Sequence, residues 1–299
     1  MLAGPSARAG SGYGTIMLMD RLFTAGVVAL LLALAPSLAA QWPRYQVPGV
    51  PRTADGQIDV NAPAPRAPDG KPDLSGIWEN FREQGQGVAS VNAAFFNEVV
   101  PSLIPQFRDI GSDLPEGLPL QPWAAELKKR RMADNSMDNP DAHCLPLGNM
   151  QLHTHVDPRR IVQTPTLIVM LYEANYGLRQ IYLDGRPAPD NDPQPWWYGY
   201  SRGWWEGDTL VVETTDFSDG GWLDINGSPL TDAATVTERF RRPSYGRLQI
   251  EVTVDDPKAY TKPWTVSLTQ KVMVDTEMME FICNENEQSS KRFVRPPPP

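Results

Sequence analysis

The sequence predicts a mostly β protein in which an antiparallel meander of strands closes into a barrel. Apolar and polar residues alternate at almost every position of segments 247–256 and 264–274, which is typical of strands with one buried face. Further strand-like segments follow one another at short spacing from residue 161, with turn residues between them and no helical pattern. That many twisted strands usually curl into a barrel or split into two packed sheets.

A signal peptide is predicted at the N-terminus, in residues 1–40. The uncharged apolar segment 22–35 follows Arg21 and precedes a small-x-small exit, Ser37-Leu38-Ala39, which is the pattern of a cleaved secretory leader. This segment is shorter than the roughly 20 apolar residues that a membrane span needs. We therefore expect a periplasmic or secreted protein without a stable membrane span after cleavage. A retained N-terminal anchor is the alternative.

The rest of the chain is predicted to form an extended arm and one domain. Residues 41–72 are rich in proline and lack apolar periodicity, so they are expected to be an extended arm. Residues 73–295 are expected to form a single barrel-like domain with a partly helical insertion at about 92–135. Within that insertion, 122–133 begins with Pro122 and is predicted to be a short helix.

The expected strands follow in order from residue 161. Segment 161–173 is apolar on both faces, as a single strand buried between two layers would be. Segment 199–217 is expected to be a hairpin with its bend at 206–208. The other expected strands are 178–186, 234–242, 247–256, 264–274 and, closing the series, 278–285.

The two cysteines, Cys144 and Cys283, are predicted to form a disulfide. Exported proteins use cysteine pairs mainly as structural bridges. A bridge between these two positions would close most of the mature chain. Two buried thiols that never meet are the alternative.

The charge balance excludes some classes of partner. The chain has a formal net charge of −9 at pH 7, from 27 Lys and Arg against 36 Asp and Glu. An acidic protein repels the phosphate backbone of nucleic acids and the surface of anionic membranes. The expected partner is therefore a small-molecule ligand and not a nucleic acid.

Gly76, Ile77 and Trp78 resemble the G-x-W motif on the first strand of lipocalins and their calycin relatives. In that family the tryptophan closes one end of a barrel that holds an apolar ligand. The resemblance implies the same position for Trp78 and a ligand inside the barrel. The long insertion between Trp78 and Ile161 departs from the compact lipocalin pattern.

A second resemblance covers roughly residues 72–285. The motifs PDLSGIW, GWWEGDTLVVET and EVTVDDPKAYTKPW resemble a large, uncharacterised family of exported bacterial proteins. This resemblance implies export and a β-rich fold, and it implies no catalytic residue.

All three histidines of the chain, His143, His153 and His155, lie in one short window. If the chain is extended there, His153, His155 and Asp157 point the same way and could bind zinc or another divalent metal, with His143 as a possible replacement for the aspartate. The stretch HTHVD resembles metal motifs of metallo-β-lactamase-like hydrolases and of cupins, but both families need a later histidine, and none follows His155. The alternatives are a polar loop and a histidine that acts as a general base without metal. No cofactor is expected beyond such a metal.

Two polar residues interrupt the apolar faces of expected strands, Glu238 in 234–242 and Gln270 in 264–274. A buried carboxylate needs a partner, so Glu238 is expected to point into the barrel, where it meets an arginine or borders a ligand cavity. Replacement of Glu238 by glutamine is then expected to change ligand affinity or turnover with little loss of stability. The alternative is an ion pair with a neighbouring arginine at the barrel rim.

These features predict an exported protein that binds a small apolar or aromatic ligand in a β-barrel. The first alternative is an enzyme that acts on such a molecule, a hydrolase, lyase or isomerase that uses Glu238 or the histidine cluster, including a metal-dependent form through His153 and His155. The second is a structural module of the cell envelope. Adjacent tryptophans at 196–197 and 204–205 favour stacking on a ligand or bracing of the barrel. The candidate ligand contacts are Trp78, Tyr172, Arg202, Trp204, Glu238 and Gln270.

Overall fold

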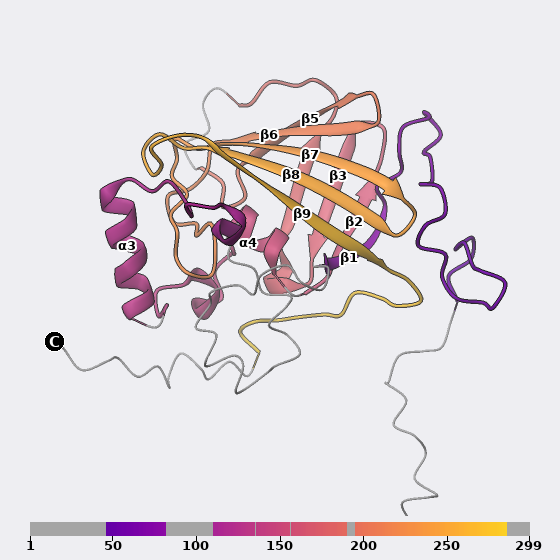
Figure 1. Ribbon diagram of the computed structural model, residues 1–299, viewed down its shortest axis with the longest axis horizontal. Helices are drawn as coiled ribbons and strands as arrows, with labels where there is room; N and C mark the ends of the chain where they lie inside the picture. The colour runs from indigo at the N-terminus through magenta and orange to yellow at the C-terminus, as the bar shows by residue number, and fades with distance from the viewer. Residues whose placement is uncertain (1–45, 82–109, 135, 156, 190–194, 286–299) are drawn as a thin grey trace, which may run out of the picture. The chain divides into compact units, whose positions relative to one another are not determined.

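The barrel predicted from the sequence is confirmed. In the computed structural model, nine strands of the described chain close into one barrel in which sequence neighbours are also neighbours in the sheet (Figure 1), and the barrel fits a lipocalin-like fold. The structure describes residues 46–81, 110–134, 136–155, 157–189 and 195–285. The predicted signal peptide and part of the predicted insertion lie outside the described residues. The strands are β1 (Gly76–Phe81), β2 (Arg159–Gln163), β3 (Leu167–Tyr172), β4 (Leu178–Tyr182), β5 (Tyr200–Glu206), β6 (Thr209–Thr215), β7 (Thr235–Ser244), β8 (Arg247–Asp255) and β9 (Trp264–Met273).

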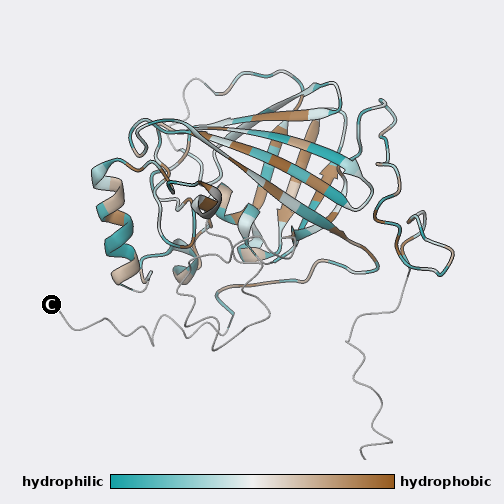
Figure 2. Ribbon diagram, viewed as in Figure 1, coloured by the Kyte–Doolittle hydropathy of each residue, from teal (hydrophilic) through white to brown (hydrophobic). Residues whose placement is uncertain are grey.

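Alternating side chains give each long strand one apolar face, visible as brown and teal bands along the strands in Figure 2. In β8 and β9, Ile250 lies opposite Leu268 and Val252 opposite Val266, and all four side chains are buried. They belong to one hydrophobic cluster, as the shared inner face requires. The predicted common interior of these two strands is therefore confirmed.

Three details of the predicted meander are wrong. Segment 161–173 is not one strand but the β2–β3 hairpin, because the Thr164 hydroxyl caps a tight turn by hydrogen bonds with the backbone N–H and C=O of Leu167. Strands β4 and β5 are parallel, and they pair only at Ile181 with Ser201 and at Tyr182 with Arg202. The described part of segment 278–285 forms no strand.

Trp78 on β1 packs into the hydrophobic cluster of the barrel. The side chain is fully buried, and its Nε1 donates a hydrogen bond to the carbonyl of Leu74 at 3.0 Å. The guanidinium of Arg242 lies 4.8 Å from the ring centroid and donates to the carbonyls of Asp73 and Ser75. The cation therefore joins the Trp78 ring to the chain that leads into β1.

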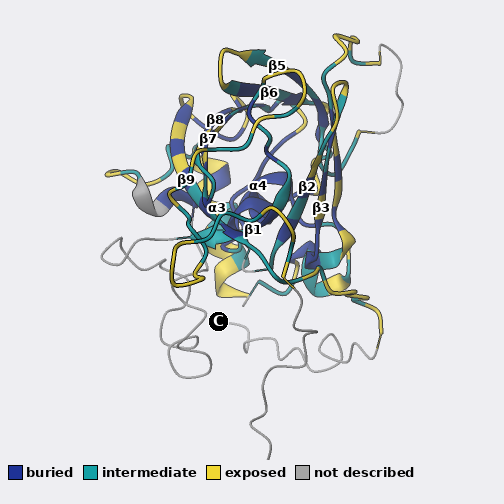
Figure 3. Ribbon diagram, turned by 90° about the vertical axis from the view of Figure 1, so that its right-hand side faces the viewer, coloured by how far each residue is buried: buried dark blue, intermediate teal, exposed yellow. Residues whose placement is uncertain are grey.

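The short helix α4 (Asn149–Thr154) fills part of the barrel interior. All six of its residues are buried, and Figure 3 shows the helix surrounded by strands. Met150 and Leu152 belong to the hydrophobic cluster of the barrel. The ring of His153 lies 6.2 Å from that of Tyr172, the last residue of β3. Residues 147–154 of the polar window are therefore an internal plug, whereas His143 and Leu145 at the start of the window are exposed.

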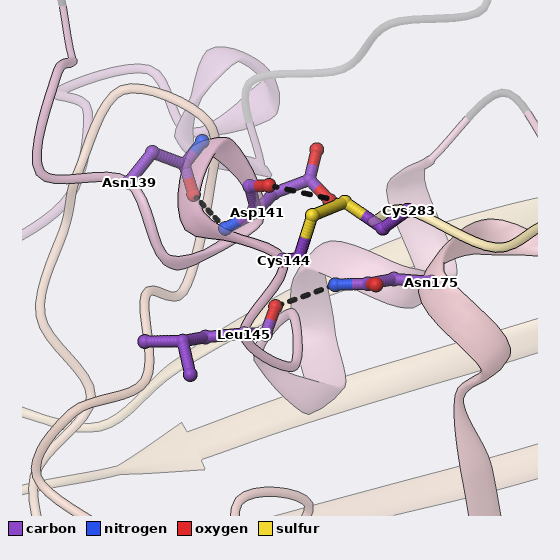
Figure 4. Close-up of a disulfide and its surroundings, with 6 residues drawn as sticks. All are labelled: Asn139, Asp141, Cys144, Leu145, Asn175 and Cys283. Carbon is purple, nitrogen blue, oxygen red and sulfur yellow. Dashed lines mark hydrogen bonds between the residues drawn. A yellow bond between two sulfur atoms is a disulfide. The ribbon is translucent and has the colours of Figure 1, made fainter. Parts of the chain in front are cut away.

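The disulfide between Cys144 and Cys283 is present, as predicted. The two Cα atoms are 5.5 Å apart. Figure 4 shows the bridge beside the side chain of Asn175, which donates a hydrogen bond to the carbonyl of Leu145 at 2.6 Å. Both contacts fix the segment that leads into α4.

The predicted helix at 122–133 is confirmed as α3 (Pro122–Ala133), with proline in its first turn. Residues 46–72 form turns and two isolated bridges, Arg52 with Ile58 and Arg66 with Pro72. In the part of the chain that the structure describes, no helix is long and apolar enough to cross a membrane. Single turns of 3-10 helix are η1 (Ile110–Asp113), η2 (Pro140–His143) and η3 (Ala174–Tyr176).

Candidate functional site

Glu238 lies at the centre of a buried polar cluster inside the barrel. Alternation along β7 places it on the same inner face as Val236 and Phe240, and all three side chains are at most 1% exposed. In the sheet it pairs with Val212 on one side and Val252 on the other. A carboxylate in such apolar surroundings is stable only if charged or hydrogen-bonding partners reach it from elsewhere.

Arg179 on β4 supplies the positive charge. Its Nη1 donates to Glu238 Oε1 at 3.0 Å and its Nη2 to Glu238 Oε2, so both carboxylate oxygens are held. Its Nε donates to Ser201 Oγ at 3.0 Å and its Nη2 also to Thr214 Oγ1 at 2.9 Å. Burial alone would lower the pKa of Arg179, but the attraction of Glu238 raises it. The guanidinium is therefore a buried cation with every nitrogen engaged.

His153, at the end of α4, reaches the same carboxylate. Its Nε2 lies 2.6 Å from Glu238 Oε1, and the ring is fully buried. Burial lowers the pKa of His153, although Glu238 opposes this effect. The imidazole is therefore neutral at pH 7, with the proton on Nε2 donated to Glu238. Its Nδ1 has no hydrogen-bond partner among the described residues.

The two partners keep Glu238 ionised. Burial raises the pKa of the carboxyl, but the attraction of Arg179 and the hydrogen bonds from His153 and Arg179 outweigh burial and hold it at about 2. The cluster thus contains one anion, one cation and one neutral imidazole. Such a charge-balanced group tolerates burial that an isolated carboxylate would not.

The backbone at the end of α4 is held by a second buried arginine. Arg159 Nη1 donates to the carbonyl of His153 at 2.9 Å, and Nη2 donates to the carbonyls of His155 and Asp157. Burial lowers the pKa of Arg159 to about 10, so it stays charged at pH 7. Arg159 therefore fixes the position from which His153 reaches Glu238.

The expected extended geometry of the histidine window is wrong. His153 lies in the last turn of α4, so its side chain turns inward to Glu238, while His155 Nδ1 lies 3.1 Å from Asp157 Oδ2. His143 Nε2 contacts the carbonyl of Met137 at 2.7 Å. Among the described residues, no three His, Cys, Asp or Glu side chains gather in a way that could hold a metal. A bound divalent metal stays a prediction, without the proposed convergence of ligands.

The other candidate ligand contacts divide between the interior and the surface. Trp78 and Tyr172 are buried, and so is Gln270, whose side-chain amide finds no hydrogen-bond partner in the described chain. Arg202 lies on the outer face of β5 and pairs with Glu213 at 2.6 Å. Trp204 is 44% exposed on the same face. The structure therefore brings Glu238, His153 and Tyr172 together and separates them from Arg202 and Trp204.

A pocket of about 270 Å³ lies where β4 and β5 diverge. Because the parallel strands pair at only two positions, the barrel wall opens beside Arg179 and Ser201, which both line the pocket. Aromatic rings cover much of its wall, and Tyr182 stacks on Tyr200 with centroids 5.2 Å apart. The other aromatic residues that line it are Trp196, Trp197 and Tyr198.

Comparisons with known families, curated proteins and solved structures found no match. The functional interpretation of the site therefore depends on the contacts within this structure. Sequence reasoning missed Arg179 as the partner of Glu238, and it missed Ser201 and Thr214, which accept hydrogen bonds from Arg179. One signal was present for Arg179, since it alternates in register with Ile181 and therefore shares that residue's inner face.

Proposed function

We propose that this is an exported binding protein for a small, flat aromatic molecule, held in the pocket between β4 and β5. The observation that carries the proposal is the aromatic wall of that pocket. Flat rings bind other flat rings by stacking and edge contacts, and ligand pockets are commonly concave and mostly apolar. We call the space lined by Tyr182, Trp196, Trp197, Tyr198 and Tyr200 the aromatic pocket.

Most rings of the aromatic pocket are partly exposed, although the guanidinium of Arg186 already lies 4.2 Å from the centroid of the Tyr182 ring. Tyr182, Trp196, Trp197 and Tyr198 are all partly exposed, whereas Tyr200 behind them is 9% exposed. Trp196 contacts Tyr200 with centroids 5.3 Å apart at an interplanar angle of 48°. The wall is thus preassembled by contacts among its own rings, so a ligand does not need to order it.

The charge of the pocket favours an uncharged ligand. Arg179 lines the pocket, but each of its nitrogens already donates to Glu238, Ser201 or Thr214. An anionic ligand would therefore have to compete with Glu238 for the guanidinium. An aromatic ring with a hydroxyl or a similar small polar group needs no such exchange.

The wall of the barrel is a better ligand position than its centre. Met150 and Leu152 of α4 pack into the same cluster as the inward-facing residues of the strands. An apolar ligand at the centre would have to displace α4. The disulfide fits export, because such bridges persist in oxidising compartments.

The proposal predicts that loss of Trp196 weakens binding of an aromatic probe. The full chain is titrated with a nitrophenol, and binding is followed by quenching of tryptophan fluorescence. Trp196→Ala is expected to raise the Kd about three- to tenfold, because an aromatic contact contributes about 0.5–1.5 kcal/mol beyond burial.

Trp204→Ala is the matched control. Trp204 is exposed on β5 outside the aromatic pocket and donates to Glu206, so its loss is expected to leave the Kd unchanged. Equal weakening by both variants would place the probe elsewhere. A native protein that gives no saturable quenching would favour the structural module over a binding protein.

A further inference from the structure

Strand β4 offers the aromatic pocket an unpaired stretch of backbone. The strand runs from Leu178 to Tyr182, but it pairs with β5 only at Ile181 and Tyr182. Leu178 and Gln180, which precede the paired residues, line the aromatic pocket, and residues 196–201 line its other side. The pocket therefore lies where the hydrogen-bonded ladder between β4 and β5 is interrupted.

The hairpin of β3 and β4 determines the direction of the backbone groups in β4. The N–H of Tyr172 donates to the carbonyl of Gly177 at 2.8 Å, and beyond the other end of β4 the N–H of Leu183 donates to the turn before β3. In an antiparallel ladder, hydrogen-bonded pairs alternate with pairs whose N–H and C=O groups point away from the partner strand. Leu178 and Gln180 lie at the alternate positions, so their backbone groups point away from β3 and toward the pocket.

This edge of β4 carries a donor and an acceptor without partners. The pairing with β5 begins where Ile181 lies opposite Ser201, and by the geometry of a parallel ladder it uses the carbonyl of Gln180. The N–H of Gln180 and the carbonyl of Leu178 precede that point. Neither group forms a hydrogen bond with any residue that the structure describes. Unpaired strand edges of this kind readily accept further hydrogen-bonding partners.

The spacing of the two groups defines the complement that they need. In a parallel sheet, the carbonyl of one residue and the N–H two residues later bind the N–H and the C=O of a single residue on the neighbouring strand. A lactam ring carries an N–H directly beside a carbonyl and offers the same complement. A flat ring bound in this way lies near the plane of the sheet. Its faces then meet side chains that project from the sheet, as that of Tyr182 does.

The edge is accessible and suits a neutral molecule. Leu178 is 50% exposed, and Gln180 is also exposed, so a ligand reaches their backbone groups from solvent. One donor and one acceptor require one acceptor and one donor from the ligand, and they require no net charge. This agrees with the state of Arg179, whose nitrogens are already engaged by Glu238 and two hydroxyls.

We propose that the unpaired edge of β4 selects the ligand of the aromatic pocket, and that this ligand is a flat heteroaromatic lactam. The ligand carbonyl accepts a hydrogen bond from the N–H of Gln180, and the ligand N–H donates to the carbonyl of Leu178. The rings of the pocket pack against the faces of the bound molecule. This inference rests on the proposed function, which supplies the aromatic wall, and it adds the polar groups that the ligand carries.

The test compares two probes that differ by one methyl group. Carbostyril is a flat bicyclic lactam, and N-methylcarbostyril keeps its rings and its carbonyl but has no N–H. In isothermal titration of the full chain, carbostyril is expected to bind with a Kd about tenfold lower, which corresponds to about 1.4 kcal/mol for two partly exposed hydrogen bonds. Equal Kd values for the two probes overturn the proposal.

Amide hydrogen exchange in the native protein tests the backbone directly. The N–H groups of Arg179 and Ile181 point to β3 and should exchange slowly, whereas that of Gln180 between them should exchange fast. Carbostyril at ten times its Kd is expected to slow exchange at Gln180 about tenfold. A Gln180 amide that is as slow as its neighbours in the free protein overturns the proposal, and so does one that bound carbostyril leaves unchanged.

Gln180→Pro removes the donor without loss of a ladder hydrogen bond, because this N–H points away from β3. The variant is expected to raise the Kd of carbostyril to that of N-methylcarbostyril. A variant that keeps the native preference for carbostyril overturns the proposal. If the variant does not fold, the exchange measurement on the native protein decides.

The two probes also separate this inference from the proposed function. If both bind equally well and Trp196→Ala weakens both, the pairing with β4 is contradicted and the aromatic pocket keeps its proposed function. Absence of saturable binding by either probe contradicts the proposed function and this inference with it.

Discussion

Replacement of Arg179 by methionine is expected to destabilise the fold by about 3–5 kcal/mol. The substitution keeps much of the side-chain volume but removes the only guanidinium that contacts Glu238 among the described residues, and the carboxylate is fully buried. Removal of one partner from a buried ion pair leaves an uncompensated charge, which accounts for a loss of this size. The free energy of unfolding is measured by urea denaturation at pH 7.

Two variants make the cause testable. In Arg179→Met/Glu238→Leu both charges are gone, so most of the lost stability should return. Arg202→Met is the matched control, because Arg202 pairs with Glu213 on the same barrel at 2.6 Å, with side chains 35% and 36% exposed. Exposed pairs contribute at most about 1 kcal/mol, so this variant should stay near native stability. Similar losses for Arg179→Met and Arg202→Met would contradict the assignment.

The effect of Glu238 on the free energy of unfolding should depend on pH with opposite signs in the native protein and in Arg179→Met. In the native protein the pKa of Glu238 is lowered from 4.5 to about 2, so its contribution is present above 4.5 and is lost as the pH falls through 2. In Arg179→Met burial dominates and raises the pKa of Glu238. Protonation then neutralises the buried carboxylate. The difference in the free energy of unfolding between the native protein and the variant should therefore shrink as the pH falls through the raised pKa of Glu238.

The same contacts change the expectation for Glu238→Gln. The sequence predicts little loss of stability, because it shows an inward carboxylate without its partners. In the structure Arg179 would be left as an unpaired buried cation, and His153 Nε2 would lose an ionic acceptor. Glu238→Gln is therefore expected to lower the free energy of unfolding. Alternation along the strand predicts that Glu238 points inward, but it does not predict these partners.

Sequence alternation predicts which face of a strand a residue lies on, but it does not predict contacts across the barrel. Alternation in β7, β8 and β9 is local, so it assigns Ile250, Val252 and Glu238 to one face without knowledge of the fold. The contact of Glu238 with Arg179 depends instead on barrel closure, since β4 and β7 are not neighbours in the sheet. No local pattern encodes that distance across the interior.

The plug is harder still to predict. Residues 149–154, NMQLHT, alternate between polar and apolar types as a short strand would, yet they form α4. A helix of this length has little intrinsic stability and depends on tertiary packing. The packing comes from Met150 and Leu152 in the core and from the contact of Arg159 with the carbonyl of His153. For this reason sequence alternation alone does not predict α4.

Removal of the disulfide is expected to lower the free energy of unfolding by about 2–5 kcal/mol. Cys144 and Cys283 are separated by 139 residues, and loop-entropy reasoning gives up to about 5 kcal/mol for a closed loop of this length. The double variant Cys144→Ala/Cys283→Ala is compared with the native protein by urea denaturation without reductant. In reductant the two proteins should unfold at nearly the same urea concentration, because the native bridge is then open.

The bridge should also decide whether the C-terminal segment stays on the barrel. Met279, Phe281 and Ile282 are 55%, 43% and 47% exposed, so burial holds this segment weakly, and the backbone N–H of Met279 adds one hydrogen bond to Glu173 at 3.0 Å. Limited proteolysis with mass spectrometry is expected to trim the double variant within residues 277–285 before the barrel is cut. If native and variant proteins are cut at the same sites and rates, other contacts hold the segment. Loss of stability without early trimming would place the effect of the bridge on the α4 side, where Cys144 precedes the plug.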